Sequence, residues 1–353
     1  MAIEFWTYRS VAPFINPLKN WQLDEQPLEF RRDPLLGHVS VFSPAIQGKR
    51  DILFPAPDPS FVQSVADATR PSCFLCDGKW EKMTPKYPDE LIPGGRLRKG
   101  EVVLFPNLFP TSSYHAVIML GNAHYRTLDD FPEDLLGDAF DVSLEFISTV
   151  FEKNRQMVYA TINANYLPPA GSSVFHPHVQ ILMAPVPSTH HEKVLRSSRR
   201  YYEEHGSSYW KDLVDTEYRK GDRYVMNIGS SHWIMAFSPM GANEVLGIFP
   251  DKGNIMKWDK DDVMALAKGA SLVLKFYHQQ GFSTFNFSLF SAPLGDDSIC
   301  YAAFVRFVCR QNFVPNYRTD DYYLQKLMEN EIIASTPEEL AGSFREMVSV
   351  QNA

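Results

Sequence analysis

Short apolar runs predict four strands in the first half of the chain. Val102–Phe105 and Ala116–Leu120 are apolar throughout, as expected of buried strands. Apolar residues alternate from Val158 to Ile162, and a further apolar run covers Val179–Ala184. Alternation places successive side chains on opposite faces of a strand, so these segments predict a sheet with one face in a core.

Between the second and third runs the apolar period changes to that of a helix. Asp130 can cap this helix and Pro132 suits its first turn. The positions that keep helical spacing are Leu136, Phe140, Leu144, Ile147 and Phe151. We expect this face to lie in the core.

The second half repeats this order of elements. Strands are predicted at Trp233–Phe237 and Glu244–Phe249, a helix at Asp259–Gln279, and strands at Thr284–Phe290 and Tyr301–Cys309. The repeat predicts an internal duplication of an α+β unit, each copy a sheet with one long helix across it.

The connection between the two copies is polar and aromatic from about Pro185 to Val225, with a helix that ends at Gly206. We place the domain boundary in this connection. The prediction is a catalytic domain over residues 1–190 and a second domain over residues 191–353.

The first 30 residues are aromatic and contain Pro13, Pro17 and Pro27. Since proline interrupts regular structure, we expect an irregular arm that packs on another surface. A turn at Asp33–Gly37 followed by alternation to Phe42 predicts a hairpin arm or edge strand.

Composition narrows the possible functions. A chain of 353 residues that is 44% hydrophobic can form two ordinary cores. A net charge of −8, a sequence pI of about 5.7 and the lack of a long Lys/Arg run argue against nucleic-acid and membrane partners. No signal peptide or stretch of 18 apolar residues is evident, so we expect a cytoplasmic protein with small soluble ligands.

The strongest candidate for chemistry is the loop and strand Gly171–Gln180. Strand alternation places His176, His178 and Gln180 on one face. Three polar side chains that converge on one side are a poor way to build a core. This pattern predicts an active site at the edge of a sheet.

Cys73 and Cys76 stand two residues apart and are followed by Gly78. In a reducing compartment, such a pair indicates metal binding or redox chemistry rather than a disulfide. A tetrahedral site needs two further ligands.

Together these features resemble the galactose-1-phosphate uridylyltransferase branch of the histidine-triad superfamily. The resemblance covers most of the chain. The matching motifs are Arg32-Asp33-Pro34-Leu35-Leu36-Gly37, the Cys73/Cys76 pair, Asn107-Leu108-Phe109-Pro110, His124 before Thr127-Leu128, and Asn165, Gly171 and Ser173 before His176-Pro177-His178-Val179-Gln180. It implies an α+β fold of duplicated histidine-triad-like domains, each a mostly antiparallel sheet with a long helix.

The resemblance implies a structural zinc ion held by Cys73, Cys76, His124 and His176. Two thiolates and two imidazoles close a tetrahedron, so the ion would hold the loop in place rather than activate water. His115 is the alternative third ligand, but its place in mid-strand favours packing or hydrogen bonding.

The resemblance also implies a role for each residue of the loop. His178 attacks the α-phosphorus of a nucleoside diphospho compound and forms a nucleotidyl-histidine. Gln180 binds the phosphoryl oxygens, together with the amides of Gly171–Ser173 and the Ser173 hydroxyl.

Further substrate contacts come from outside the loop. The resemblance assigns Asn107 and Asn165 to substrate. Two basic pairs, Arg31/Arg32 and Lys49/Arg50, are the first candidates for contact with phosphate.

Two departures from the family leave the hexose open. Val179 replaces a common glycine, and the segment Asp297–Ala303 lacks the family's histidines and sugar contacts. With these histidines absent, we expect no second metal near Glu203 or Glu204.

Three functions therefore remain. The first is a galactose-1-phosphate uridylyltransferase-like enzyme that exchanges a nucleoside monophosphate between a nucleotide-sugar and a sugar 1-phosphate. The second is a phosphorylase that passes AMP from ADP-glucose or a dinucleoside polyphosphate to phosphate. The third is a non-catalytic nucleotide-binding zinc protein. By analogy with the family we expect a homodimer.

Overall fold

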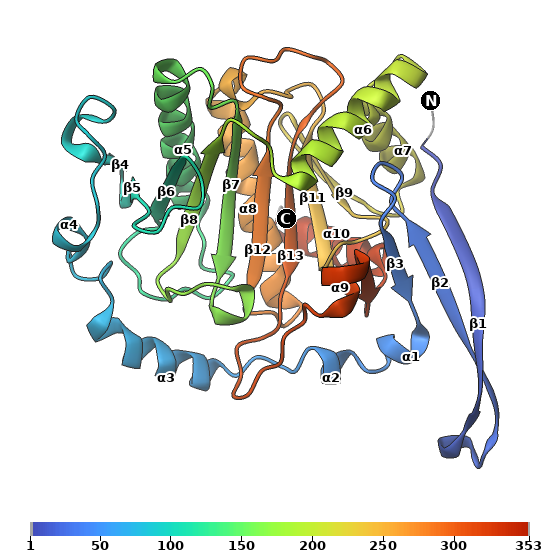
Figure 1. The fold of residues 1–353 in the computed structure, drawn as a ribbon. Helices are drawn as coiled ribbons and strands as arrows, with labels where there is room; N and C mark the ends of the chain where they lie inside the picture. The colour runs from blue at the N-terminus through green and yellow to red at the C-terminus, as the bar shows by residue number, and fades with distance from the viewer. Residues whose placement is uncertain (1–2, 352–353) are drawn as a thin grey trace.

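The computed structural model describes residues 3–351, which form one large sheet with helices on both faces and a projecting hairpin (Figure 1). The ten strands of the large sheet run in the order β4-β5-β6-β8-β7-β12-β13-β11-β10-β9, and every neighbouring pair is antiparallel.

The strand order shows the predicted duplication. The first copy consists of β4 (Leu97–Lys99), β5 (Val102–Pro106), β6 (Tyr114–Met119), α5 (Glu133–Lys153), β7 (Tyr159–Tyr166) and β8 (His178–Ala184). The second consists of β9 (Tyr224–Ile228), β10 (Ser231–Met235), β11 (Ala242–Phe249), α8 (Lys260–Gln279), β12 (Phe285–Phe290) and β13 (Ala303–Cys309). The copies join through the pair β7–β12, where Asn165 lies opposite Asn286. The fold class predicted from the sequence is confirmed.

The long helices α5 and α8 cover the back of the sheet, with α10 (Pro337–Gln351) beside them (Figure 1). Their apolar faces and the inward residues of the strands form one continuous core. Asp259, where the second helix was predicted to begin, caps α8. In α5 the cap position is occupied by Pro132, and Asp130, the predicted cap, lies two residues further out.

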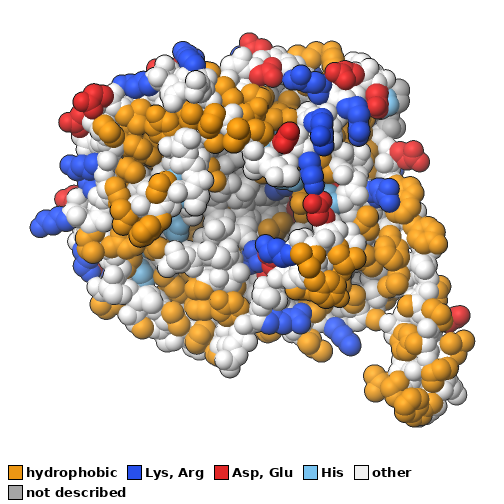
Figure 2. All heavy atoms as spheres, in the orientation of Figure 1, with side chains coloured by type: hydrophobic (Ala, Val, Ile, Leu, Met, Phe, Trp, Pro, Cys, Tyr) orange, Lys and Arg blue, Asp and Glu red, His pale blue; other side chains and the backbone are white. Residues whose placement is uncertain are grey.

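A second, smaller core covers the front of the second copy. Helices α6 (Thr189–His205) and α7 (Tyr209–Lys220) pack there, and the Trp210 ring stacks on Phe304 at 4.3 Å. Gly206 ends α6 at φ 69°, as predicted, while α7 was not expected. These helices cover the second copy, and Figure 2 shows that the molecule is hollowed in front of the middle of the sheet.

The N-terminal arm is regular, and the expectation of an irregular segment is wrong. β1 (Trp6–Asn16) and β2 (Gln22–Arg32) pair over eleven positions to form the projecting hairpin (Figure 1). Pro13 lies on β1, which is an edge strand. Pro27 lies on the part of β2 that pairs with β1 alone, because β3 (Val39–Phe42) reaches only Glu29–Arg32 of β2. A missing N–H is tolerated at both places.

Residues from the start of the chain pack against later parts of the chain. Strand β3 pairs in parallel with β14 (Asn330–Ile333), which lies near the end of the chain. The Arg31 guanidinium bonds the Glu338 carboxylate at 2.9 Å, and the Ser40 hydroxyl lies 2.9 Å from that of Ser238. The boundary at 190/191 stays a prediction, because the two halves share one sheet.

The remaining helices are short. They are α1 (Pro44–Gln47), α2 (Arg50–Leu53), α3 (Pro59–Thr69), α4 (Trp80–Met83) and α9 (Tyr323–Met328), with single-turn helices η1 (Pro17–Lys19), η2 (Arg70–Ser72), η3 (Pro93–Gly95), η4 (Pro168–Ala170) and η5 (Ile255–Lys257). Across residues 3–351, no helix combines the length and apolar character needed to cross a membrane.

Gly269 on α8 allows a close contact with the buried Trp233. A Cβ at this position would lie 1.8 Å from the indole ring, which is itself tied to the Ser231 hydroxyl. Gly269→Ala is therefore expected to lower the free energy of unfolding by about 3 kcal/mol. Gly342→Ala, which places its methyl in open space on α10, is the matched control and should stabilise by about 0.5–1 kcal/mol. Urea denaturation of both variants measures the difference; equal stabilities would contradict the packing.

Candidate active site

The candidate site lies on the front of the sheet at the start of β8. Burial alternates along β7 and β8, so that His178, Gln180 and Asn163 project from the face that α5 and α8 leave free. The cross-strand register continues this polar row from Asn163 to Ser288 and then to Arg306. The sheet thus presents a polar strip that crosses from the first copy to the second, on the side that is hollowed in Figure 2.

The structure brings the four predicted metal ligands together. The ligand atoms of Cys73, Cys76, His124 and His176 all lie within 4.8 Å of one another, and all four residues are buried. Cys76 Sγ is 3.2 Å from His124 Nδ1 and 3.4 Å from His176 Nδ1, and Cys73 Sγ is 3.9 Å from the latter. Tetrahedral zinc with its usual bond lengths separates its ligands by about 3.5 Å.

Hydrogen bonds turn both imidazoles toward the sulfur atoms. His176 Nε2–H donates to the Gly121 carbonyl at 2.9 Å. His124 Nε2–H donates to Thr69 Oγ1 at 3.0 Å, and that hydroxyl donates onward to Val65. Nδ1 of each ring is left as the ligand atom, an arrangement typical of metal-bound histidines.

The electrostatics of the cluster fit a cation. Burial lowers the pKa of His176 to about 4 and also lowers that of His124, so both rings are neutral ligands near pH 7. Burial and the neighbouring Cys73 raise the pKa of Cys76 to about 12. A thiolate there requires a positive ion, and two thiolates with two imidazoles match zinc in a closed site.

His178 is held in one tautomer. Its Nδ1–H donates to the His176 carbonyl at 2.9 Å, which leaves the lone pair on Nε2. Nε2 makes no hydrogen bond to any residue in the range 3–351. Burial lowers the pKa of His178, so its ring is the neutral, nucleophilic form near pH 7. The metal ligand and the candidate nucleophile are therefore coupled through one backbone carbonyl.

The loop before β8 is shaped by Gly171. Gly171 directly follows η4, and its φ of 88° lies in the left-handed region that favours glycine. The Ser172 hydroxyl is turned inward and donates to the Val174 carbonyl at 2.6 Å, whereas Ser173 is exposed. Of the two serines, Ser173 therefore has its hydroxyl available to a ligand.

Asn165 is oriented by the second copy, which the sequence analysis did not foresee. Asn286 Nδ2 donates to Asn165 Oδ1 at 2.7 Å and to the Ala170 carbonyl at 2.9 Å. Arg310 in turn donates to Asn286 Oδ1 at 2.7 Å and is itself paired with Asp320. The polar Asn286 within the apolar strand Phe285–Phe290 was the one signal that could have identified it.

His115 lies in this site but outside the metal cluster. Its Nε2 is 2.7 Å from Gln180 Oε1 and 3.1 Å from Asn107 Nδ2. Of the two histidines considered for the third ligand, the structure brings His124 to the cysteines and His115 to the two carboxamides.

Lys49 and Arg50 have no contact with these groups in the structure. Lys49 is exposed before α2, and Arg50 donates to the Gln280 carbonyl and lies over the Phe282 ring. Their role in substrate binding stays a prediction.

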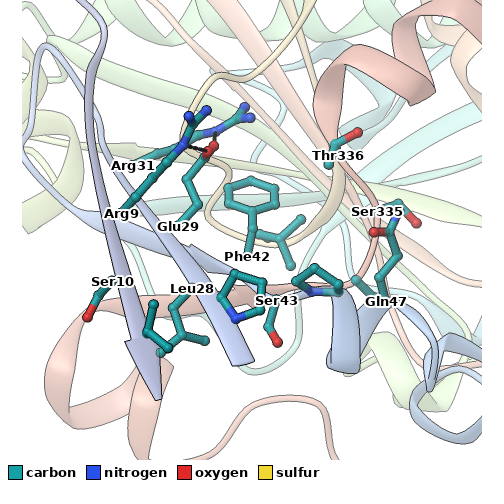
Figure 3. Close-up of a pocket in the computed structure, with 15 residues that line it drawn as sticks. Arg9, Ser10, Leu28, Glu29, Arg31, Phe42, Ser43, Gln47, Ser335 and Thr336 are labelled. Atoms are coloured by element: carbon teal, nitrogen blue, oxygen red, sulfur yellow. Dashed lines mark hydrogen bonds and ion pairs between the residues drawn. The ribbon is translucent and has the colours of Figure 1, made fainter. Parts of the chain in front are cut away.

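A cavity of about 440 Å³ lies elsewhere, between the base of the hairpin, α1 and the segment before α10 (Figure 3). The Arg9 and Arg31 side chains meet the Glu29 carboxylate on one side of it, and Phe42 lies below them. Arg31, a candidate for phosphate contact, lines this cavity but is paired with Glu29 and Glu338. The histidine strand and the metal cluster do not line it, so we do not assign the cavity to nucleotidyl transfer.

Known proteins share this fold. The structure of an ADP-glucose phosphorylase from Arabidopsis thaliana with bound ADP-glucose aligns with a TM-score of 0.68 at 19% identity, over 90% of this chain and 99% of that one. A uridylyltransferase structure aligns with a TM-score of 0.68 at 18% identity, over 92% and 99%. The chain therefore has the fold of these two proteins.

Sequence comparison gives a nearer relative. A protein of Archaeoglobus fulgidus described as uncharacterized is 31% identical over 97% of this chain and 99% of its own length, and the chain belongs to the same family. The sequence of the Arabidopsis ADP-glucose phosphorylase is 24% identical over 77% of this chain and 80% of that protein. No protein-family model matches the chain.

Proposed function

We propose that the protein is a nucleotidyltransferase that carries a nucleoside monophosphate on His178, from a nucleotide-sugar to a sugar 1-phosphate or to phosphate. The observation that carries this proposal is the His178 ring, neutral, fixed through Nδ1 and with Nε2 free on the polar face of the sheet. An imidazole in this state is a nucleophile at phosphorus and also leaves readily from it.

The proposed reaction has two balanced steps. Nε2 forms a bond to the α-phosphorus as the bond from phosphorus to the bridging oxygen breaks, and sugar 1-phosphate leaves. A phosphate oxygen of the acceptor then bonds to phosphorus, the P–N bond breaks, and the ring returns to its neutral form. In the intermediate the ring is positively charged, and the His176 carbonyl that accepts from Nδ1–H stabilises that charge.

The neighbouring residues bind the phosphoryl group in this proposal. The Nε2 amino group of Gln180, the Ser173 hydroxyl and the amides of Gly171–Ser173 supply hydrogen-bond donors. Asn165 and Asn107 offer further carboxamides. Zinc in the Cys73/Cys76/His124/His176 cluster would supply structural rigidity, because it holds His176 and thereby the carbonyl that fixes His178.

A phosphorylase is the second candidate. The sequence relation to an ADP-glucose phosphorylase supports it, as does the lack of histidines in the segment Asp297–Ala303. Both candidates share the first step and differ in the acceptor. The free Nε2 of His178 argues against the third, non-catalytic possibility.

One experiment separates the three. The protein is incubated in turn with UDP-glucose, ADP-glucose and a dinucleoside tetraphosphate, and an acid-labile adduct is sought by mass spectrometry. The base in the adduct identifies the donor. Glucose 1-phosphate, galactose 1-phosphate and inorganic phosphate are then compared as the acceptor that discharges it. Lack of an adduct with every donor would support the non-catalytic protein.

Asn286 provides a test of whether the second copy supports the site of the first. Asn286→Ala removes the donor that orients Asn165 and is expected to lower kcat/KM about tenfold, the cost of one orienting hydrogen bond. Asn227→Ala, on the exposed edge strand β9, is the control and should retain full activity. An unchanged rate in Asn286→Ala would contradict the role of Asn165.

We also propose a homodimer. The hairpin exposes large apolar side chains, including Leu18 and Trp21, whose exposed fractions are 92% and 73%. A projecting ribbon with such residues is typical of an association surface. The predicted cytoplasmic location remains an expectation from the sequence.

A further inference from the structure

Two carboxamides of the site meet at one imidazole. His115 is 6% exposed and is the second residue of β6, directly beside β8. Its Nε2 lies 2.7 Å from Gln180 Oε1 and 3.1 Å from Asn107 Nδ2. His115 is neither the predicted nucleophile nor part of the metal cluster, so its contact with Gln180 needs another explanation.

The other ring nitrogen determines the tautomer of His115. The Thr111 backbone N–H donates to Nδ1 at 3.1 Å. A proton on Nδ1 would face this N–H, so Nδ1 is the acceptor and the proton is on Nε2. Nε2–H then donates to Gln180 Oε1. The loop Asn107–Thr111 folds back on β6 and thereby determines which way the imidazole donates.

The tautomer in turn orients the Gln180 carboxamide. With its oxygen held by His115, its amino group is the end that remains free, and it has no partner among residues 3–351. Without His115, rotation about the last side-chain bond would exchange oxygen and nitrogen at little cost. An oxygen directed at a phosphoryl group would repel it.

The Asn107 carboxamide is also held by its oxygen. Its Oδ1 accepts from the Phe109 backbone N–H at 2.9 Å, so its amino group is also directed away from its own loop. That amino group lies beside Nε2–H, which cannot accept from it, and is left for a ligand oxygen. Both carboxamides next to His115 Nε2 thus have their oxygen bound and their amino group available.

We propose that His115 is a positioning residue that presents the amino group of Gln180 to the phosphoryl group in transfer. This inference rests on the proposed function. His115 does not touch the substrate or exchange a proton. His115 excludes the orientation in which the Gln180 oxygen faces the substrate. The Gln180 amino group is thereby in position as a donor before the substrate arrives.

A double-mutant cycle tests the proposal. The rate of adduct formation at His178 in a single turnover is measured for the wild type, His115→Phe, Gln180→Ala and the double variant. His115→Phe is expected to be about 30-fold slower, since it keeps the ring and loses the donor. In the Gln180→Ala background the same change should alter the rate by less than about twofold. An equal loss in both backgrounds would overturn the proposal, as would no loss in either.

A conservative variant separates positioning from packing. His115→Gln can place its own amino group near the position of Nε2, and it should recover most of the rate lost in His115→Phe. Equal rates in the two variants would show that only the fit of the side chain matters. Thermal melting of each variant checks that the fold is retained.

A spectroscopic readout makes the test independent of turnover. In protein labelled with ¹⁵N-histidine, the nitrogen shifts of His115 should show a proton on Nε2, assigned by loss of the signal in His115→Phe. The opposite tautomer would overturn the proposal even in an active enzyme. If the wild type forms no adduct yet shows this tautomer, the proposed function fails while the orientation of Gln180 stands.

Discussion

Replacement of His178 by asparagine is expected to lower the rate of nucleotidyl transfer by at least about 10⁴-fold. Asparagine can still donate to the His176 carbonyl, so the loop should keep its shape, but it has no nitrogen lone pair to attack phosphorus. The rate of adduct formation with the donor that labels the wild type is the measurement. Zinc content and melting temperature should stay within error of the wild type.

A second histidine provides the control for this substitution. His278 is exposed near the end of α8, on the helix layer behind the sheet, where it faces Asp129. His278→Asn should transfer nucleotide at the wild-type rate. Adduct formation that persists in His178→Asn would place the nucleophile elsewhere and remove the basis of the proposed function.

The second large effect is expected at the metal cluster. Cys76→Ala removes the thiol that lies close to both ligand imidazoles and should abolish zinc binding. Since a closed zinc site contributes its binding energy to folding, we expect the free energy of unfolding to fall by about 3–5 kcal/mol. Transfer should be lost as well, because the His176 carbonyl no longer holds His178 in place. Metal analysis, thermal melting and adduct formation measure the three effects.

Cys309 is the matched control for the loss of a buried thiol. It is 1% exposed in the main core and lies on β13, outside the cluster. Cys309→Ala should cost about 1 kcal/mol through the space that it leaves and should keep its zinc. If Cys76→Ala retained one zinc ion per chain and the stability of Cys309→Ala, the cluster would not be the metal site.

The regular elements of both copies were predictable because their signals are local. The helical period of Leu136 to Phe151 and the alternation of Val158 to Ile162 each lie within one segment, and they appear as α5 and β7. The hairpin was missed because three prolines argue against strands in general, whereas a two-stranded ribbon has positions that need no N–H. That tolerance depends on the neighbouring strands.

The candidate site also contains both residues that are close together in the sequence and residues that are far apart. Residues close together in the chain, such as Cys73 with Cys76 and His178 with Gln180, could be paired from their spacing. The choice between His115 and His124 as third ligand could not be derived in this way, because each is tens of residues from the cysteines. Asn286 is further still, 121 residues from the Asn165 that it orients.

By itself the sequence determined the duplicated α+β units, the two-residue spacing of the thiols and the histidine strand, since these depend on periods and short spacings along the chain. The tertiary structure decided which imidazole joins the thiols, which ring nitrogen of His178 is free, and that the second copy supports the first. Those features depend on strand register and on hydrogen bonds between distant segments. They exist only after β7 pairs with β12 and the loop after β5 folds back onto β6.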